Sequence, residues 1–341
     1  MGELRCRPAV DGACRRCEIR RGGRVVLCER SLAKLDGRSE RRAWIGRRLS
    51  FGAHGTVGDV TVRVEHLAGR DRLDATTHVL QRARRVDPAG GVWEAADVQW
   101  WWRRSRLSDD VALPVWFDGD GPCAVVGVTD WATRCQLDAH VVPGTMDLEL
   151  VWSAVMEAGA TSNATLEVLA RDDDAELRGL LTAEGFQATQ ERSGIMWMAA
   201  ADRPVVAPLP DGFGVIDRLS RPLRRHPFTA RNGTEVEDRL RQCSLYDPWL
   251  DLAVDTPNGE PAGYALFWFD DVTLVGMLEP MRVDYRYQRR GLARALLTAG
   301  LDRLVARGAQ RLKVGFDSPA ARHLYESAGF AVTSTLRSFR R

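Results

Sequence analysis

The fold is decided by the stretch Gly276-Met-Leu-Glu-Pro-Met-Arg-Val-Asp-Tyr-Arg-Tyr-Gln-Arg-Arg-Gly-Leu-Ala-Arg-Ala-Leu-Leu297. Its apolar pattern predicts a strand over 273–283, a short loop at 288–291, and a helix that begins at Gly291. A strand-loop-helix unit points backbone N–H groups and the positive end of a helix dipole at one place. The stretch therefore predicts an anion site that suits a pyrophosphate.

Several side chains in this loop fit such a site. Gly291 permits close approach of a ligand to the backbone, and Ala293 keeps the next helical turn thin. Arg289, Arg290 and Arg294 add positive charge that can attract or contact phosphate. Taken alone, the same residues also fit the start of an ordinary surface helix.

A resemblance to a known family follows from two motifs. The first, Gln288-Arg-Arg-Gly-Leu-Ala293, resembles the Gln/Arg-x-x-Gly-x-Gly/Ala signature of the GNAT superfamily of N-acetyltransferases. The second, Ser318-Pro-Ala-Ala-Arg-His-Leu-Tyr-Glu-Ser-Ala-Gly-Phe330, is similar to the family's Asn-x-x-Ala-x-x-Leu-Tyr followed by Gly-Phe. The resemblance covers 213–341 well and extends loosely to 57–200. It implies a mixed α/β fold, with a mostly antiparallel sheet flanked by helices, and acetyl-CoA as co-substrate.

Carried over to this sequence, the family pattern implies a set of residues that hold acetyl-CoA. Backbone groups of two strand residues would pair with the pantetheine arm, and the loop and first helical turn would hold the pyrophosphate. Ser318 stands where the family commonly has Asn, so a shorter hydroxyl would have to make that contact. The implied residues are Met281, Val283, Gln288, Arg289, Arg290, Gly291, Leu292, Ala293, Arg294 and Ser318.

Two residues are the implied catalytic groups. Tyr325 would lie near the thioester sulfur as general acid for the leaving thiolate. Its alternative role is a core aromatic. Glu279, beside Pro280 in the strand, is the candidate base that deprotonates the amine, directly or through water; it could instead be an exposed charge beside a bulge. His226 and Asp251 are weaker candidates for the base.

The chain also contains a faint internal repeat. Gly185-Phe186 and Gly329-Phe330 lie 144 positions apart, and both follow a predicted strand and short helix. The first copy has no basic loop at the start of its helix, offering Asp147 and Glu149 instead, and Leu181 stands where the second copy has Tyr325. We therefore expect two GNAT-like domains, the first degenerate and serving as scaffold or as one wall of the substrate cleft.

Composition predicts where the domains begin and end. An arginine-rich extension over 1–56 comes first, and within it residues 1–50 hold 13 Arg and one Lys against six acids. We expect it to be poorly ordered, with a zinc site at Cys14 and Cys17 as the alternative. The degenerate domain follows over 57–200, then a proline-rich linker over 201–212, then the catalytic domain over 213–341.

The functional expectation is an N-acetyltransferase that acts on a primary amine of a small molecule or peptide, by direct attack in a ternary complex. A non-catalytic acyl-CoA sensor is the alternative. No stretch of about 18 apolar residues and no secretory signal is present, which favours a cytoplasmic protein without a membrane partner. The basic extension carries no module that reads nucleic-acid bases, so we expect neither a nucleic-acid partner nor a metal.

Overall fold

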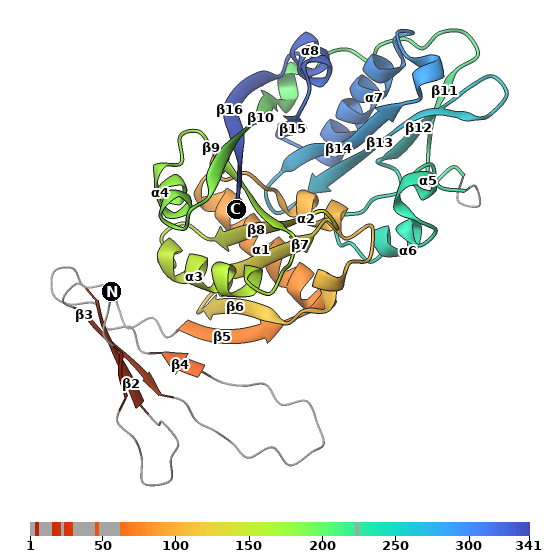
Figure 1. Ribbon diagram of the computed structural model, residues 1–341. Coiled ribbons are helices and arrows are strands. Elements are labelled where there is room, and N and C mark those ends of the chain that lie inside the picture. The colour runs from red at the N-terminus through yellow and green to blue at the C-terminus, as the bar shows by residue number, and fades with distance from the viewer. Residues whose placement is uncertain (1–3, 7–15, 22–23, 30–44, 48–61, 222–224) are drawn as a thin grey trace.

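The computed structural model describes residues 62–221 and 225–341, together with four short segments of the extension (Figure 1). These segments form the strands β1 (Leu4–Cys6), β2 (Arg16–Arg21), β3 (Arg24–Glu29) and β4 (Ile45–Arg47). The other residues of 1–56 lie outside the described part of the chain, and Cys14 of the alternative zinc site is one of them. The expectation that this extension is poorly ordered therefore stays a prediction. The backbone of β4 pairs with β5, the next strand of the chain.

The N-terminal half begins with one strand and two helices, and a run of strands with helices between them comes next. The Trp-rich segment over 92–102, for which the sequence predicted no element, supplies helix α2. The elements of this half are β5 (Val62–Leu67), α1 (Gly69–Val86), α2 (Ala95–Trp101), β6 (Leu113–Asp118), β7 (Gly121–Asp130), β8 (Arg134–Val141), α3 (Leu148–Gly159), β9 (Thr165–Arg171), α4 (Ala175–Ala183) and β10 (Gln187–Ala199).

The C-terminal half repeats this order, as the internal repeat predicted. Two short helices lie between its first two strands, and the second of them ends at Leu240. The elements are β11 (Gly214–Asp217), α5 (Thr229–Asn232), α6 (Val236–Leu240), β12 (Asp251–Asp255), β13 (Pro261–Asp270), β14 (Val275–Val283), α7 (Leu292–Arg307), β15 (Arg311–Phe316), α8 (Pro319–Ser327) and β16 (Ala331–Arg340).

The strands of both halves join into one sheet, in the order β11-β12-β13-β14-β15-β10-β16-β9-β8-β7-β6-β5-β4. Most neighbours are antiparallel, whereas β8 with β9 and β14 with β15 are parallel. The last strand of each half lies beside the other half: β10 pairs with β15, and β16 pairs with β9. The halves therefore exchange their final strands, and β10 pairs with β16 at the centre of the sheet.

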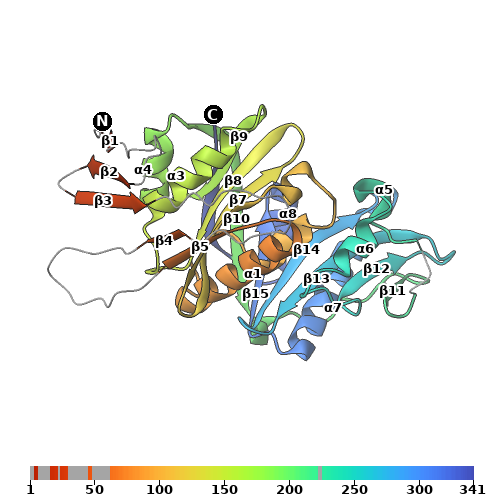
Figure 2. The ribbon, with the colours of Figure 1, turned by 90° about the horizontal axis from the view of Figure 1, so that it is seen from below.

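Helices cover both faces of this sheet. Helices α3 and α4 pack on the N-terminal half, and α7 and α8 pack on the C-terminal half (Figure 1). Figure 2 shows α1 near the centre of the molecule, with the strands of the N-terminal half on one side and β12 to β14 on the other. Side chains of α1 and α2 share a core with α6, β13 and β14, including Trp100, Phe228, Leu240 and Trp268. The first half is thus packed directly against the second.

The predicted linker lies between β10 and β11, where the chain has little regular structure. A short 3-10 turn, Ala200–Asp202, is followed by residues 203–210 without regular structure. The domain bounds themselves stay a prediction. Because β10 and β16 are exchanged, each predicted domain contributes one strand to the sheet of the other.

Candidate active site

The candidate site is built around the end of β14. The parallel pairing of β14 with β15 covers only Val275 to Leu278, while the antiparallel pairing with β13 continues to Val283. The register with β13 shifts between Leu278 and Met281, so Glu279 and Pro280 form a bulge. The sheet therefore opens after Leu278, and no strand of the described part of the chain lies beside one edge of β14 from Glu279 to Val283. Met281 and Val283 belong to this segment of β14.

The loop after β14 leads into the start of α7. Tyr285–Tyr287 form a 3-10 turn, and Arg289 and Gly291 both adopt positive φ, at 62° and 79°. Gly291 is the N-cap of α7 and no side chain caps the helix. The first N–H groups of α7 are therefore available to a ligand, which is the arrangement that binds phosphate at helix N-termini.

The side chains of this loop divide into exposed and buried sets. Gln288, Arg289, Arg290 and Arg294 are exposed at the mouth of the opening. The Gln288 amide donates to the Val283 carbonyl at 3.1 Å, and Arg294 donates to the Ser327 carbonyl at 3.4 Å. Leu292 is 1% exposed and belongs to the core under α7, so only its backbone can contact a ligand. Ala293 is partly buried on the same first turn.

Glu279 lies at the bulge in a partly buried position facing α2 of the N-terminal half. Burial raises the pKa of Glu279 to about 7; Asp97 and Asp317 add to the rise, while Arg103 and a hydrogen bond with the Trp100 side chain oppose it. Asp97 is affected in the same way, since burial raises its pKa to about 6. A carboxyl group with a pKa near neutrality can both accept and release a proton at physiological pH.

Tyr325 and Ser318 come from α8 and its cap. Tyr325 is 7% exposed, and its ring packs edge-to-face on Phe330 at 6.1 Å. Burial, then the charges of Glu279 and Asp317, raise the pKa of Tyr325, so the phenol stays protonated at neutral pH. The ring therefore belongs to the core, while its hydroxyl lies close enough to Glu279 to feel that charge. The Ser318 hydroxyl caps α8, accepting from the Ala321 N–H at 3.4 Å.

The two weaker candidates for the base are bound to each other. His226 Nε2 lies 2.6 Å from Asp251 Oδ2, and the Tyr246 hydroxyl donates to the same oxygen at 2.8 Å. His226 Nδ1 accepts from the Phe228 N–H, which assigns the ring proton to Nε2. Both ring nitrogens of His226 are thus occupied within a buried network, which supports a structural role.

The sequence missed the contribution of α2. Asp97, Trp100 and Arg103 all act on Glu279, although they lie about 180 residues earlier in the chain. The only sequence feature that draws attention to this segment is its density of tryptophan over 92–102. That density does not indicate which face of the sheet these residues cover. Arg103 stacks on the Trp100 ring at 4.0 Å, and burial lowers the pKa of Arg103 to about 10.

The equivalent place in the N-terminal half is closed to an anion. The Asp147 carboxylate caps α3 and accepts from the Glu149 N–H at 2.9 Å. The Asp147 carboxylate therefore accepts a hydrogen bond from a first-turn N–H group of α3, whereas no side chain caps α7. The negative charge of Asp147 would also repel a phosphate. Leu181, at the position of Tyr325, is fully buried in the core of this half.

Comparison with known proteins agrees with this geometry. The model of the Acetyltransferase (GNAT) family matches residues 218–330. A mycothiol acetyltransferase of Kocuria rhizophila is 27% identical over 239 residues, covering 62% of this chain and 78% of that protein. The [ribosomal protein bS18]-alanine N-acetyltransferase of Escherichia coli K12 is 39% identical over 88 residues, covering 25% of this chain and 57% of that protein.

Solved structures share the fold over most of the chain. A tandem GNAT protein from the clavulanic acid biosynthesis pathway superposes with a TM-score of 0.58 at 13% identity, covering 82% of this chain and 98% of that one. A GCN5-related N-acetyltransferase from Sphaerobacter thermophilus gives a TM-score of 0.54 at 17% identity, covering 82% of this chain and 95% of that one. At such identities the likeness shows the fold alone.

Proposed function

We propose that this chain, whose residues 218–330 match the model of the Acetyltransferase (GNAT) family, transfers the acetyl group of acetyl-CoA to a primary amine of a small molecule or a peptide. The observation that carries the proposal is the position of Glu279 at the point where β14 leaves β15, from which its charge acts on the Tyr325 hydroxyl and raises the pKa of Tyr325. One relative is named for mycothiol and the other for an alanine of a ribosomal protein, so both acceptor classes remain within the proposal.

The free edge of β14 and the start of α7 would hold acetyl-CoA. Backbone groups of Met281 and Val283 would pair with the pantetheine amides, as a neighbouring strand would. The N–H groups that follow Gly291, with the exposed arginines beside them, would bind the pyrophosphate. The hydroxyl of Ser318 already caps α8, so we expect it to contribute little to binding.

Starting from an ammonium acceptor, the nitrogen loses two protons and the departing thiolate gains one. Glu279, with a pKa of about 7, accepts a proton from the ammonium form of the acceptor, directly or through water. The neutral amine attacks the thioester carbon in the ternary complex, and the C–S bond breaks as the amide forms. Tyr325 donates its proton to the departing thiolate and is reprotonated by the second proton, which the nitrogen loses as the amide forms. Proximity supplies much of the acceleration, because a neutral amine is a good nucleophile.

The proposal assigns the N-terminal half a supporting role. Its α2 forms a wall beside Glu279, and its own cofactor position is blocked by Asp147. No helix among the described residues is long and apolar enough to cross a membrane. We place the activity in the cytoplasm because the reaction consumes acetyl-CoA, an intracellular metabolite.

Two measurements test the proposal in sequence. Acetyl-CoA and free CoA should raise the melting temperature of the full chain, since a ligand that binds only the folded state stabilises it. No stabilisation by either would overturn the cofactor site. A free-thiol assay with a panel of amines then separates an enzyme from a sensor: binding without release of CoA by any amine would support the sensor.

The Tyr325→Phe variant tests the general acid. We expect kcat to fall about 100-fold while acetyl-CoA binding is retained, because the ring still fills the core and only the proton donor is lost. Tyr285→Phe is the matched control, since Tyr285 is 81% exposed in the loop before α7. Equal turnover by the wild-type protein and Tyr325→Phe would remove Tyr325 from the mechanism.

A further inference from the structure

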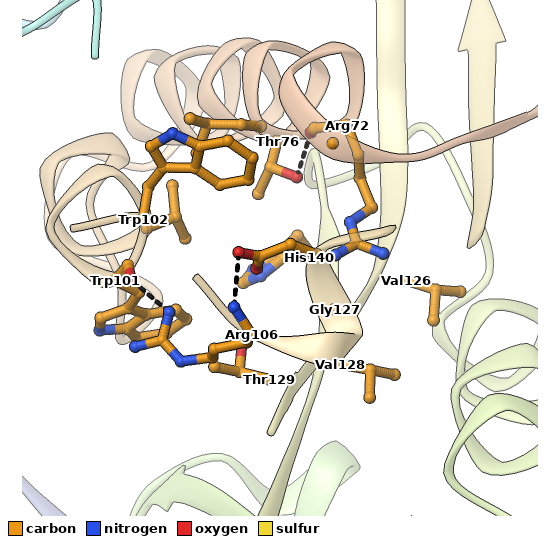
Figure 3. Close-up of a pocket in the computed structure, with 14 residues that line it drawn as sticks. Arg72, Thr76, Trp101, Trp102, Arg106, Val126, Gly127, Val128, Thr129 and His140 are labelled. Carbon is orange, nitrogen blue, oxygen red and sulfur yellow. Dashed lines mark hydrogen bonds between the residues drawn. The ribbon is translucent and has the colours of Figure 1, made fainter. Parts of the chain in front are cut away.

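A second cavity lies in the N-terminal half, apart from the site at Glu279. It is bounded by α1, α2, the segment after α2, and strands β7 and β8, and it contains about 520 Å³ of empty space, part of it open to solvent. Figure 3 shows His140, Arg72, Arg106, Trp101 and Trp102 around this space. We call this cavity the His140 pocket.

The imidazole of His140 is the first sign of a ligand. His140 is 6% exposed and lines the cavity, yet it has no hydrogen-bond partner among the residues that the structure describes. The neighbouring Asp138 carboxylate is already engaged, accepting from Trp93 Nε1 at 2.7 Å and from Gln136 Nε2 at 2.8 Å. Burial lowers the pKa of His140, so the ring is neutral and offers one donor and one acceptor.

Gly127 of β7 keeps the His140 ring accessible from the strand. A Cβ atom at this position would lie 3.0 Å from His140 Nε2 and 3.0 Å from the Cβ of Asp138. Any larger residue would press on the imidazole and reduce the cavity beside it. Because buried polar groups are normally paired, a neutral imidazole facing an open space indicates that something from outside pairs with it.

The charge of the pocket is positive. Arg72 donates to the carbonyls of Val111 and Ser108, each at 2.6 Å. Arg106 donates to the carbonyls of Trp101 and Arg104, and its guanidinium stacks on the Trp131 ring at 4.3 Å. Neither guanidinium forms an ion pair with a carboxylate in the described part of the chain. Both are partly buried, and burial lowers the pKa of Arg72 and, to about 10, that of Arg106. An anion in the pocket would relieve this desolvation cost.

The one carboxylate at the pocket already has a strong partner. Asp109 accepts from Arg239 of α6 at 2.6 Å and from the Arg106 backbone N–H at 3.1 Å. Arg239, which is not among the residues lining the cavity, thus largely offsets the negative charge of Asp109. The apolar part of the lining comes from Trp101 and Trp102 together with Leu73, Val98, Val126 and Val128.

We propose that the His140 pocket binds a small organic anion with a flat apolar body, such as an aryl carboxylate. The carboxylate accepts hydrogen bonds from Arg106 and from the His140 N–H, and the apolar ring lies against Trp101 and Trp102. Glu279 is not among the residues that line the His140 pocket, so the occupant of the pocket need not be the acceptor amine.

Phenylacetate is the probe for a test on the full chain. We expect it to raise the melting temperature in a saturable way, while the neutral isostere phenylacetamide and the cation benzylamine do not. The variant Arg106→Gln should weaken phenylacetate binding by about tenfold or more, as a lost charge-assisted hydrogen bond does. The matched control is Arg104→Gln, because Arg104 is an exposed arginine two residues earlier that is not among the residues lining the cavity.

A second variant covers the case in which Arg106→Gln unfolds. His140→Phe keeps an aromatic ring but removes the donor, and it should also abolish the preference for phenylacetate over phenylacetamide. Equal stabilisation by both ligands, no stabilisation at any concentration up to 10 mM (roughly the weakest affinity of interest), or an unchanged response in both variants would overturn the proposal. Stabilisation by acetyl-CoA should survive in both variants, so the two sites can fail separately.

Discussion

At the scale of single residues, Glu279 is the candidate base whose pKa the surrounding structure raises toward neutrality. Its carboxyl lies between Asp97 and Asp317 in a site that α2 shields from water, and burial raises its pKa to about 7. A base with this pKa is deprotonated in a large fraction of molecules at neutral pH and still binds a proton well. The bulge at Glu279 and Pro280 turns this part of β14 out of the regular ladder.

The pH dependence of kcat/KM follows from that value. Glu279 must be deprotonated to accept a proton, so activity should fall as the pH drops through about 7. In Glu279→Gln we expect kcat/KM at pH 8 to fall about 100-fold and the break near pH 7 to vanish. The control is Glu326→Gln, since Glu326 is exposed on α8 and pairs only with Arg322 in the described residues. Persistence of the break in Glu279→Gln would assign it to another group.

At the scale of elements, the junction between β14 and α7 combines an open strand edge with an uncapped helix. The positive φ of Gly291 turns the chain into the helix without a side chain over the first N–H groups. In the N-terminal half, the Asp147 carboxylate performs that capping role instead. The two helices therefore differ at one residue. Gly291 leaves the first N–H groups of α7 free for the proposed ligand, whereas Asp147 accepts a hydrogen bond at the start of α3.

A pair of glycine variants tests this junction. Gly291 and Gly259 have nearly the same φ, 79° and 78°, and a Cβ at either would meet no neighbour within 4 Å. Alanine at each should therefore cost a similar amount of stability, about 1 kcal/mol, through left-handed backbone strain. Only Gly291→Ala should also raise the KM for acetyl-CoA, because it lies at the proposed pyrophosphate site. Thermal unfolding and initial rates measure the two effects, and equal KM values in the two variants would exclude the site.

At the scale of the whole molecule, a buried ionic cluster joins the halves. Glu94, at the N-cap of α2, contacts Lys313 of β15 at 2.9 Å and is bound on its other side by Arg84 of α1. Burial by itself would raise the pKa of Glu94, but Lys313 and Arg84 together lower it, so the carboxylate stays charged. Lys313 also lies 5.7 Å from the Trp197 ring of β10, the exchanged strand.

Removal of the Lys313 charge should weaken the whole fold. Lys313→Met keeps the aliphatic stem but leaves Glu94 with one cation, and breaking such a buried pair costs about 3 kcal/mol. Arg311→Met is the matched control, because Arg311 also stacks on Trp197, at 4.9 Å, but forms no ion pair with Glu94. Chemical denaturation should show the larger loss for Lys313→Met. Equal midpoints for the two variants would show that the cluster contributes little.

The exchange of β10 and β16 makes the halves dependent on each other. Each half keeps its own α/β order, but its final strand pairs inside the sheet of the other. The N-terminal half is therefore more than a degenerate copy: α2 shields Glu279, and β10 completes the sheet beside β15. The ribosomal-protein acetyltransferase that matches 88 residues of this chain aligns with only part of this assembly.

The sequence by itself determined the features that depend on local order. The apolar periodicity, the glycine at the start of α7 and the Gly-Phe repeat predicted the strands, the helix start and the tandem α/β fold, because these depend on residues a few positions apart. Tertiary structure alone decided the strand exchange, the environment of Glu279 and the His140 pocket. Each depends on contacts between residues about 100 or more positions apart or on burial, and burial sets a pKa through desolvation, which no local pattern encodes.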